Sequence, residues 1–276
     1  MPEVRVNQLR LHYVTQGDGP AVILLHELGG STQTWRVLQP SLARAGFRAV
    51  ALDLRGAGRS ELPTAAYSLL DLASDVLGFM DAVGFPQGFL VGLAVGGLVA
   101  LQVAVTSRRR VLGLVVLDGA LVIPEANATY ARQRAATVVR EGMAAVVDQS
   151  ISRSFPPPVA AACPQVMRTY RDRFLQNNPQ GYAFATLAAL GADFREAAPS
   201  LDLPVLVLVG EHDLLFPPEQ SQMLAEVLPQ ATYHVIPGAG HFPPLQAPEA
   251  VRKLVVTFLE RCVAGEGRSY GPGHAK

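Results

Sequence analysis

The chain of 276 residues has little that would attach it to a nucleic acid, a metal ion or a membrane. Its 23 lysines and arginines are balanced by 23 aspartates and glutamates, whereas a nucleic-acid-binding surface needs a basic excess. Its two cysteines, Cys163 and Cys262, are far apart and lack a Cys-x-x-Cys partner, which excludes a zinc site. No apolar run approaches the ~20 residues that span a bilayer. We therefore expect no nucleic-acid partner, no metal and no membrane segment.

A secretory signal and a cofactor-binding motif are also missing. The first residues do not show a charged segment followed by an apolar one, and two free thiols suit a reducing compartment. We therefore expect a cytoplasmic protein. The glycines at 92, 96 and 97 do not have the spacing of a dinucleotide-binding loop, so no cofactor is expected. The expected partner is a small-molecule substrate, and the expected assembly is a monomer or a homodimer.

Apolar segments of strand length alternate with segments of helical periodicity along most of the chain. With 49% hydrophobic residues, the chain can bury a sizeable core. The alternation predicts an α/β fold, with a mostly parallel sheet covered by helices on both faces. An opening hairpin over residues 4–15 should turn at residues 7–8. Further strands are expected at residues 21–25, 47–54, 88–93, 111–117, 204–209 and 232–236, and helices at 32–45, 67–83, 218–227 and 248–262.

The alternation stops between residues 124 and 197. This segment has polar helical stretches, is interrupted by three prolines at 156–158, and has no convincing strand. Helices inserted between two core strands predict a cap at the carboxyl end of the sheet. We accordingly assign residues 1–123 and 198–264 to a core domain, residues 124–197 to a helical cap, and residues 265–276 to a glycine-rich, disordered tail.

The most informative motif is the sequence GLAVGG at residues 92–97. It follows an apolar strand-like run and precedes an apolar helix-like run, which is the framework of the Gly-x-Ser-x-Gly nucleophile elbow. Ala94 stands where that motif has serine. Alanine has no group that can attack a carbonyl, so the framework is present without its nucleophile.

Four more motifs occur in the order expected of one family. They are HELGG at 26–30, DLRGAGRS at 53–60, VLVLVGEHD at 205–213 and PGAGH at 237–241. With the elbow, they make the chain resemble the α/β-hydrolase family over roughly residues 4–262, and 3-oxoadipate enol-lactonases and related small-substrate hydrolases most closely. The resemblance implies a mostly parallel sheet of about eight strands with a helical cap.

The same resemblance implies the roles of the site residues. His241, in a glycine-built turn, would be the general base, and Asp213, at the end of a strand, would orient it. Taken singly, the two could be an exposed loop histidine and a helix-capping aspartate. Asp118 ends the strand after the elbow and is the fallback for the acid. The backbone amides of Leu28 and Val95 would form the oxyanion hole.

Glu27 is a second departure from the family, which has glycine after the histidine of that loop. A carboxylate there opposes developing negative charge. We favour a solvated surface group; the alternative is an acid of raised pKa, or a base that positions water. In the cap, five arginines could meet an anionic substrate, and we expect one or two to face the cleft: Arg132, Arg134, Arg153, Arg168 and Arg171.

Three functions remain open on the sequence. The first is an enzyme without a serine nucleophile, in which His241 and Asp213 act on a small ester, lactone or related carboxylic acid derivative, or on a carbon–carbon bond. The second is an enol-lactonase-like or esterase-like hydrolase whose serine was replaced by experiment. The third is a non-catalytic ligand-binding protein. Two coordinated departures, Ala94 and Glu27, favour natural divergence, whereas retention of His241 and Asp213 favours an enzyme over a binding protein.

Overall fold

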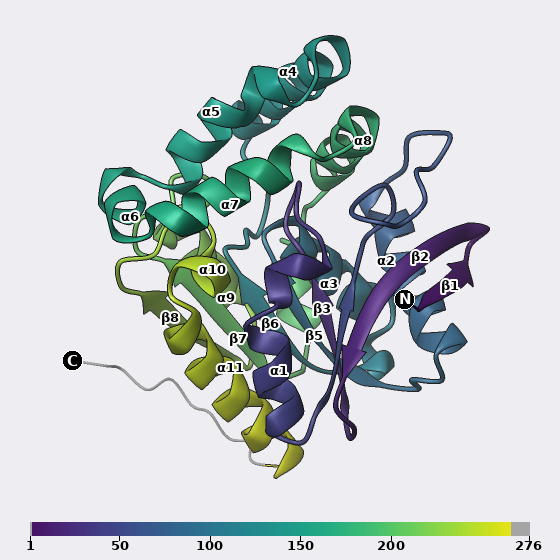
Figure 1. The fold of residues 1–276 in the computed structure, drawn as a ribbon. Helices are drawn as coiled ribbons and strands as arrows, with labels where there is room; N and C mark the ends of the chain where they lie inside the picture. Colours follow the sequence, from purple (N-terminus) through teal and green to yellow (C-terminus); the bar gives the residue numbers. More distant parts are fainter. Residues whose placement is uncertain (1, 266–276) are drawn as a thin grey trace.

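The computed structural model describes residues 2–265, which form an eight-stranded sheet flanked by helices (Figure 1). The strand order is β1-β2-β4-β3-β5-β6-β7-β8; β1 and β2, and β2 and β4, pair antiparallel, and all other neighbours pair parallel. The strands are β1 Glu3–Val6, β2 Leu9–Gln16, β3 Ala21–Leu25, β4 Arg48–Leu52, β5 Gly88–Leu93, β6 Val111–Leu117, β7 Val205–Gly210 and β8 Ala231–Ile236. The predicted α/β sheet is thereby confirmed, whereas all but the first residue of the predicted tail lie outside the described residues.

The central strands are apolar throughout because helices cover both of their faces. Successive side chains of a strand point to opposite faces, and β3 divides accordingly: Ile23 and Leu25 enter one core, Val22 and Leu24 the other. The first core includes side chains of three helices: α2 Leu69–Ala82, α3 Val95–Thr106 and α9 Pro218–Val227. The second is covered by α1 Leu38–Arg44 and α11 Pro248–Val263. This arrangement fixes the carboxyl ends of the parallel strands at one edge.

Two short elements depart from the predicted pattern. The helix expected over residues 32–45 is divided into a 3₁₀ helix, Thr32–Trp35, and α1. Pro40 explains the division, because in one continuous helix its ring would clash with the carbonyl group of Arg36; in the structure it lies in the first turn of α1. The opening hairpin turns where expected, with Asn7 and Gln8 both at positive φ.

The segment between β6 and β7 is helical, and no strand of the sheet lies within residues 124–197. Its helices lie together at one end of the sheet, at the top of Figure 1. They are α4 Glu125–Glu141, α5 Ala144–Ser154, α6 Pro157–Ala162, α7 Pro164–Leu175 and α8 Pro179–Ala189. The prolines at 156–158 begin α6 rather than only interrupting the segment, since proline suits the first position of a helix. The cap boundaries that we assigned as a domain stay a prediction.

Within residues 2–265, none of the helices is both long enough and apolar enough to span a bilayer.

Candidate active site

Ala94 occupies a strained turn between β5 and α3. Its φ of 50° and ψ of −114° are disfavoured for any residue with a side chain. Its N–H donates to the Leu117 carbonyl oxygen at 2.8 Å, which ties the turn to β6. Gly96 lets α3 pack this closely, because a Cβ there would lie 2.1 Å from the Leu25 carbonyl oxygen. The backbone therefore has the sharp strand-to-helix turn that the elbow motif predicts, with a methyl group at its tip.

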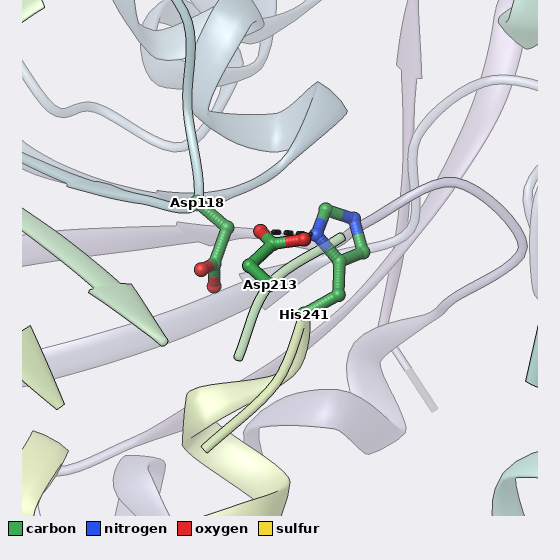
Figure 2. Close-up of side chains that lie close together, drawn as sticks. All are labelled: Asp118, Asp213 and His241. Atoms are coloured by element: carbon green, nitrogen blue, oxygen red, sulfur yellow. Dashed lines mark hydrogen bonds and ion pairs between the residues drawn. The ribbon is translucent and has the colours of Figure 1, made fainter. Parts of the chain in front are cut away.

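His241 and Asp213 are brought together by the loops that follow β8 and β7. His241 Nδ1 lies 2.8 Å from Asp213 Oδ2, which is a hydrogen-bond distance (Figure 2). Asp213 Oδ1 accepts from the backbone N–H groups of Leu215 and Phe216, at 2.7 and 3.1 Å. Both side chains are buried. A carboxylate bound to Nδ1 places the proton there, which leaves Nε2 as the basic nitrogen of the ring.

Asp213 lies between Asp118 and His241, so Asp118 does not replace it as the partner of the imidazole (Figure 2). Its Oδ1 accepts from the Gly210 N–H at 2.9 Å, whereas its buried Oδ2 has no donor within the described chain. Burial, and then the neighbouring Asp213 carboxylate, raise the pKa of Asp118 well above its ordinary value. In the protonated form, Oδ2 becomes a donor that faces Asp213. The geometry thus favours Asp213, rather than Asp118, as the partner of His241.

One potential metal-ligand atom from each of Asp118, Asp213 and His241 lies within 4.8 Å of the other two, close enough to hold a metal ion. The hydrogen bond between His241 and Asp213 already occupies one potential ligand atom of each, Nδ1 and Oδ2. The expectation that no metal binds stays a prediction.

A cavity of ≈ 140 Å³ lies between the core and the cap and is lined by residues of both. Ala94 and His241 line it on the core side, together with Leu28 and Val95, the two predicted oxyanion residues. Val95 is the first residue of α3, so its N–H has no partner inside the helix. The cap side is formed largely by polar and aromatic side chains that include Tyr130, Arg134, Ser150, Arg153, Tyr170 and Tyr182. One small cavity is thus lined by every residue predicted as nucleophile position, general base or oxyanion donor; only Asp213, the predicted acid, is buried beside it.

Glu27 is buried, so the prediction of a solvated surface group is wrong. It is 3% exposed, and it lines a cavity whose other side includes Tyr170 and Tyr182 of the cap. The Thr34 hydroxyl donates to both carboxyl oxygens, at 2.9 and 3.1 Å. Burial raises the pKa of Glu27, although the nearby His26 and His241 oppose this. Glu27 lines the cavity that contains Ala94 and His241.

Two of the five cap arginines, Arg134 and Arg153, line the cavity, which agrees with the expected number. Arg132 and Arg171 instead form ion pairs at the surface with Glu125 and Asp148, and the exposed Arg168 donates to Gln165. Three tyrosines that line the cavity were not predicted from the sequence as site residues: Tyr130, Tyr170 and Tyr182. The cap helix that carries Tyr182 could have been predicted from Asn178, which caps it by accepting from two backbone N–H groups.

Comparison with known proteins identifies the family. A model described as the alpha/beta hydrolase fold matches residues 20–248. RutD of Variovorax paradoxus, named as a candidate carbamate hydrolase, is 34% identical over 262 residues, covering 92% of this chain and 97% of that protein. 3-Oxoadipate enol-lactonase 2 of Acinetobacter baylyi is 29% identical over 254 residues, covering 91% of this chain and 93% of that protein. The solved enol-lactonase of Burkholderia xenovorans LB400 is 32% identical with a TM-score of 0.88, covering 94% of this chain and 100% of that one. The chain therefore belongs to the α/β-hydrolase family.

Proposed function

We propose that this protein hydrolyses a small ester, lactone or related carboxylic acid derivative with water activated by His241, and without an acyl-enzyme. One observation carries the proposal: His241, which is hydrogen-bonded to the buried Asp213, lines the same cavity as Ala94, whose strained turn persists without a nucleophile. A general base that retains its carboxylate partner suits proton transfer, which a protein that only binds ligands would not need.

The reaction follows from the groups around the cavity. The substrate carbonyl oxygen accepts from the backbone N–H groups of Leu28 and Val95. His241 Nε2 takes a proton from a water molecule while the water oxygen bonds to the carbonyl carbon, and the carbonyl electron pair moves onto oxygen. Asp213 stabilises the imidazolium that forms. When the tetrahedral intermediate collapses, the bond to the leaving group breaks and His241 returns the proton to that group.

The methyl group of Ala94 is compatible with this route. A serine would place its hydroxyl between His241 and the substrate, and that hydroxyl would itself be the nucleophile. Alanine lacks this oxygen, so a water molecule can take the same position relative to Nε2. Residue 94 therefore shapes the site, and the nucleophile comes from solvent.

Glu27 assists in its protonated form under this proposal. An ionised carboxylate beside the oxyanion loop would oppose the charge that develops on the substrate oxygen. Burial raises the pKa of Glu27 and so favours the neutral acid, although the hydrogen bond from the Thr34 hydroxyl opposes this. We further propose that the protein acts in the cytoplasm, as a monomer or homodimer, without a cofactor.

A substrate panel with His241→Ala tests the proposal. The panel comprises small esters, lactones and carbamates, with Arg168→Ala as a control because Arg168 is an exposed cap residue. We expect turnover of at least one member by the unaltered chain, a loss of about 10²–10⁴-fold in His241→Ala, and no loss in the control. Turnover that survives in His241→Ala would refute the proposal. If nothing is turned over while ligands raise the melting temperature, the protein is a binding protein.

A further inference from the structure

A second cavity, the outer cavity, adjoins the inner cavity that is lined by Ala94 and His241. Its volume is ≈ 690 Å³, against ≈ 140 Å³ for the inner cavity, and among the described residues the two linings share only Glu27 and Tyr170. The loop after β3, the turn after β4 and the end of cap helix α7 all contribute to the lining of the outer cavity. Apart from Glu27, the proposed hydrolysis uses none of these residues, so that reaction does not account for the outer cavity.

The lining of the outer cavity is rich in hydrogen-bond donors. The Ser31 hydroxyl oxygen accepts from the Gln33 N–H at 3.3 Å, so its own hydrogen stays available to a ligand. The Asn178 side-chain oxygen accepts from the backbone N–H groups of Gln180 and Gly181, at 2.9 and 3.0 Å, which leaves the amide NH₂ group as the part that can donate. Both side chains thus cap helices with their oxygens and keep their donor groups for a ligand.

Two carboxyl groups line the outer cavity, and both are buried. Asp53 Oδ1 accepts from the Thr32 N–H at 2.6 Å, and its Oδ2 accepts from the Arg59 N–H at 2.9 Å. Glu27 accepts from the Thr34 hydroxyl, and burial raises its pKa and so favours the neutral form. The carboxyl oxygens of the lining are therefore already engaged by donors of the protein.

Two arginines of the outer cavity, Arg36 and Arg173, interact with each other and have no carboxylate partner within the described chain. Arg36 follows the 3₁₀ helix and is exposed, and Arg173 lies in the last turn of α7 and is half-buried, so both have accessible surface. Burial, and then the charge of Arg36, lower the pKa of Arg173, although Glu27 opposes this. The two guanidinium groups therefore repel each other, and they cannot relieve this by losing a proton.

We propose that Arg36 and Arg173 bind a phosphate group, free or as part of a phosphate ester, in the outer cavity. A carboxylate has a single charge, which one guanidinium can pair, whereas a phosphate ester has a charge of about −1.5 to −2 and three terminal oxygens, so it can bridge two guanidiniums. Ser31 and Asn178 offer donors to the remaining oxygens. The volume of ≈ 690 Å³ leaves room for the organic part of an ester. This site does not depend on the proposed hydrolysis.

Calorimetric titration with inorganic phosphate, glycerol 3-phosphate and glycerol tests the proposal on the unaltered chain, Arg173→Gln, Arg36→Gln and Arg173→Lys. We expect both phosphates to bind and glycerol not to bind. Binding to Arg173→Gln should be about 10-fold weaker or more, because a half-buried charge-assisted contact is lost. The exposed Arg36 should contribute less, about threefold, and Arg173→Lys should recover part of the loss. Tighter binding of glycerol 3-phosphate identifies an ester as the ligand, and equal affinities identify free phosphate; either result supports the site.

Two arginines outside the proposed site are matched controls. Arg168 is an exposed residue of the same helix, α7, and Arg134 lines the inner cavity. Arg168→Gln and Arg134→Gln should each bind phosphate within about twofold of the unaltered chain. Without ligand, Arg173→Gln should melt no lower than the unaltered chain, because it removes one of two repelling charges. Absence of phosphate binding by the unaltered chain, unchanged binding in Arg173→Gln, or an equal loss in either control would overturn the proposal.

Discussion

At the scale of single residues, Ala94 shows that the turn is maintained by its surroundings. A non-glycine residue in this region of φ and ψ costs about 1–3 kcal/mol. The hydrogen bond from Ala94 N–H to Leu117, and those from Gly97 and Leu98 to the Ala94 carbonyl, hold the conformation. Loss of the nucleophile would therefore leave the turn in place, and with it the Val95 amide.

Glu27 should make stability depend on pH. The pKa of its carboxyl group is raised from the ordinary value of 4.5 by burial. As pH rises above about 4.5, the unfolded chain releases this proton while the folded protein keeps it, so the free energy of unfolding falls. Glu27→Gln removes this loss and can still accept from Thr34. We therefore expect Glu27→Gln to gain stability over the unaltered protein as pH rises, by up to about 1.4 kcal/mol per pH unit.

Urea denaturation between pH 4 and pH 8 measures this difference, with Glu226→Gln as the control because Glu226 is an exposed carboxylate of α9. The control should show no such trend. A constant difference between Glu27→Gln and the unaltered protein across this range would contradict a raised pKa.

Local sequence predicted some site residues better than others. His241 and Asp213 could be predicted because each follows a strand in a turn, and strands of a parallel sheet deliver such residues to one edge. The burial of Glu27 could not, because Glu27 lies in a cavity lined on its other side by cap residues such as Tyr170 and Tyr182, about 150 residues away along the chain. Interactions of that kind are not encoded in the residues next to Glu27.

At the scale of elements, the approach of α3 to β3 depends on Gly96. A Cβ there would lie 2.1 Å from the Leu25 carbonyl oxygen, which no side-chain movement can relieve. We expect Gly96→Ala to push α3 away and to destabilise the protein by about 3 kcal/mol or more. The displacement should also move the Val95 amide and lower kcat.

Chemical denaturation and kcat measure both effects. The control is Gly191→Ala in the cap, where the nearest atom to a new Cβ is 3.5 Å away; its stability should change by under about 1 kcal/mol. A Gly96→Ala protein of unchanged stability and kcat would show that the turn tolerates a wider separation than we infer.

Element boundaries were predictable where the signal is local. Alternating apolar residues predicted the two strands of the opening hairpin, and apolar segments of strand length predicted the other six. The capping box of Ser68 and Asp71 explains the start of α2. The division of the helix over residues 32–45 follows from Pro40 but was missed. Helices α6 and α8 were also missed. Helix α6 is short and begins at a proline, so its sequence carries little helical periodicity.

At the scale of the whole molecule, the site lies where the core meets the cap. The cap contributes Arg134 and Arg153 to the cavity lining, and core loops contribute His241, Leu28 and Val95. Phe155, Tyr170 and Phe174 of the cap join Phe242 of the core in one aromatic cluster, with ring centroids 4.6–5.8 Å apart. The sequence predicted that one or two of five arginines would face the cleft. It could not select Arg134, because burial on a helix depends on which face meets the core.

The measurement that tests the central claim most directly compares the unaltered chain with Ala94→Ser on the substrate that the panel selects. We predict that the unaltered chain turns over this substrate, and that an ester-like phosphonate inactivates and labels Ala94→Ser but leaves the unaltered chain unmodified and active. The contradicting result is an inactive unaltered chain whose turnover Ala94→Ser restores by orders of magnitude, since loss of a catalytic serine can lower the rate about 10⁶-fold.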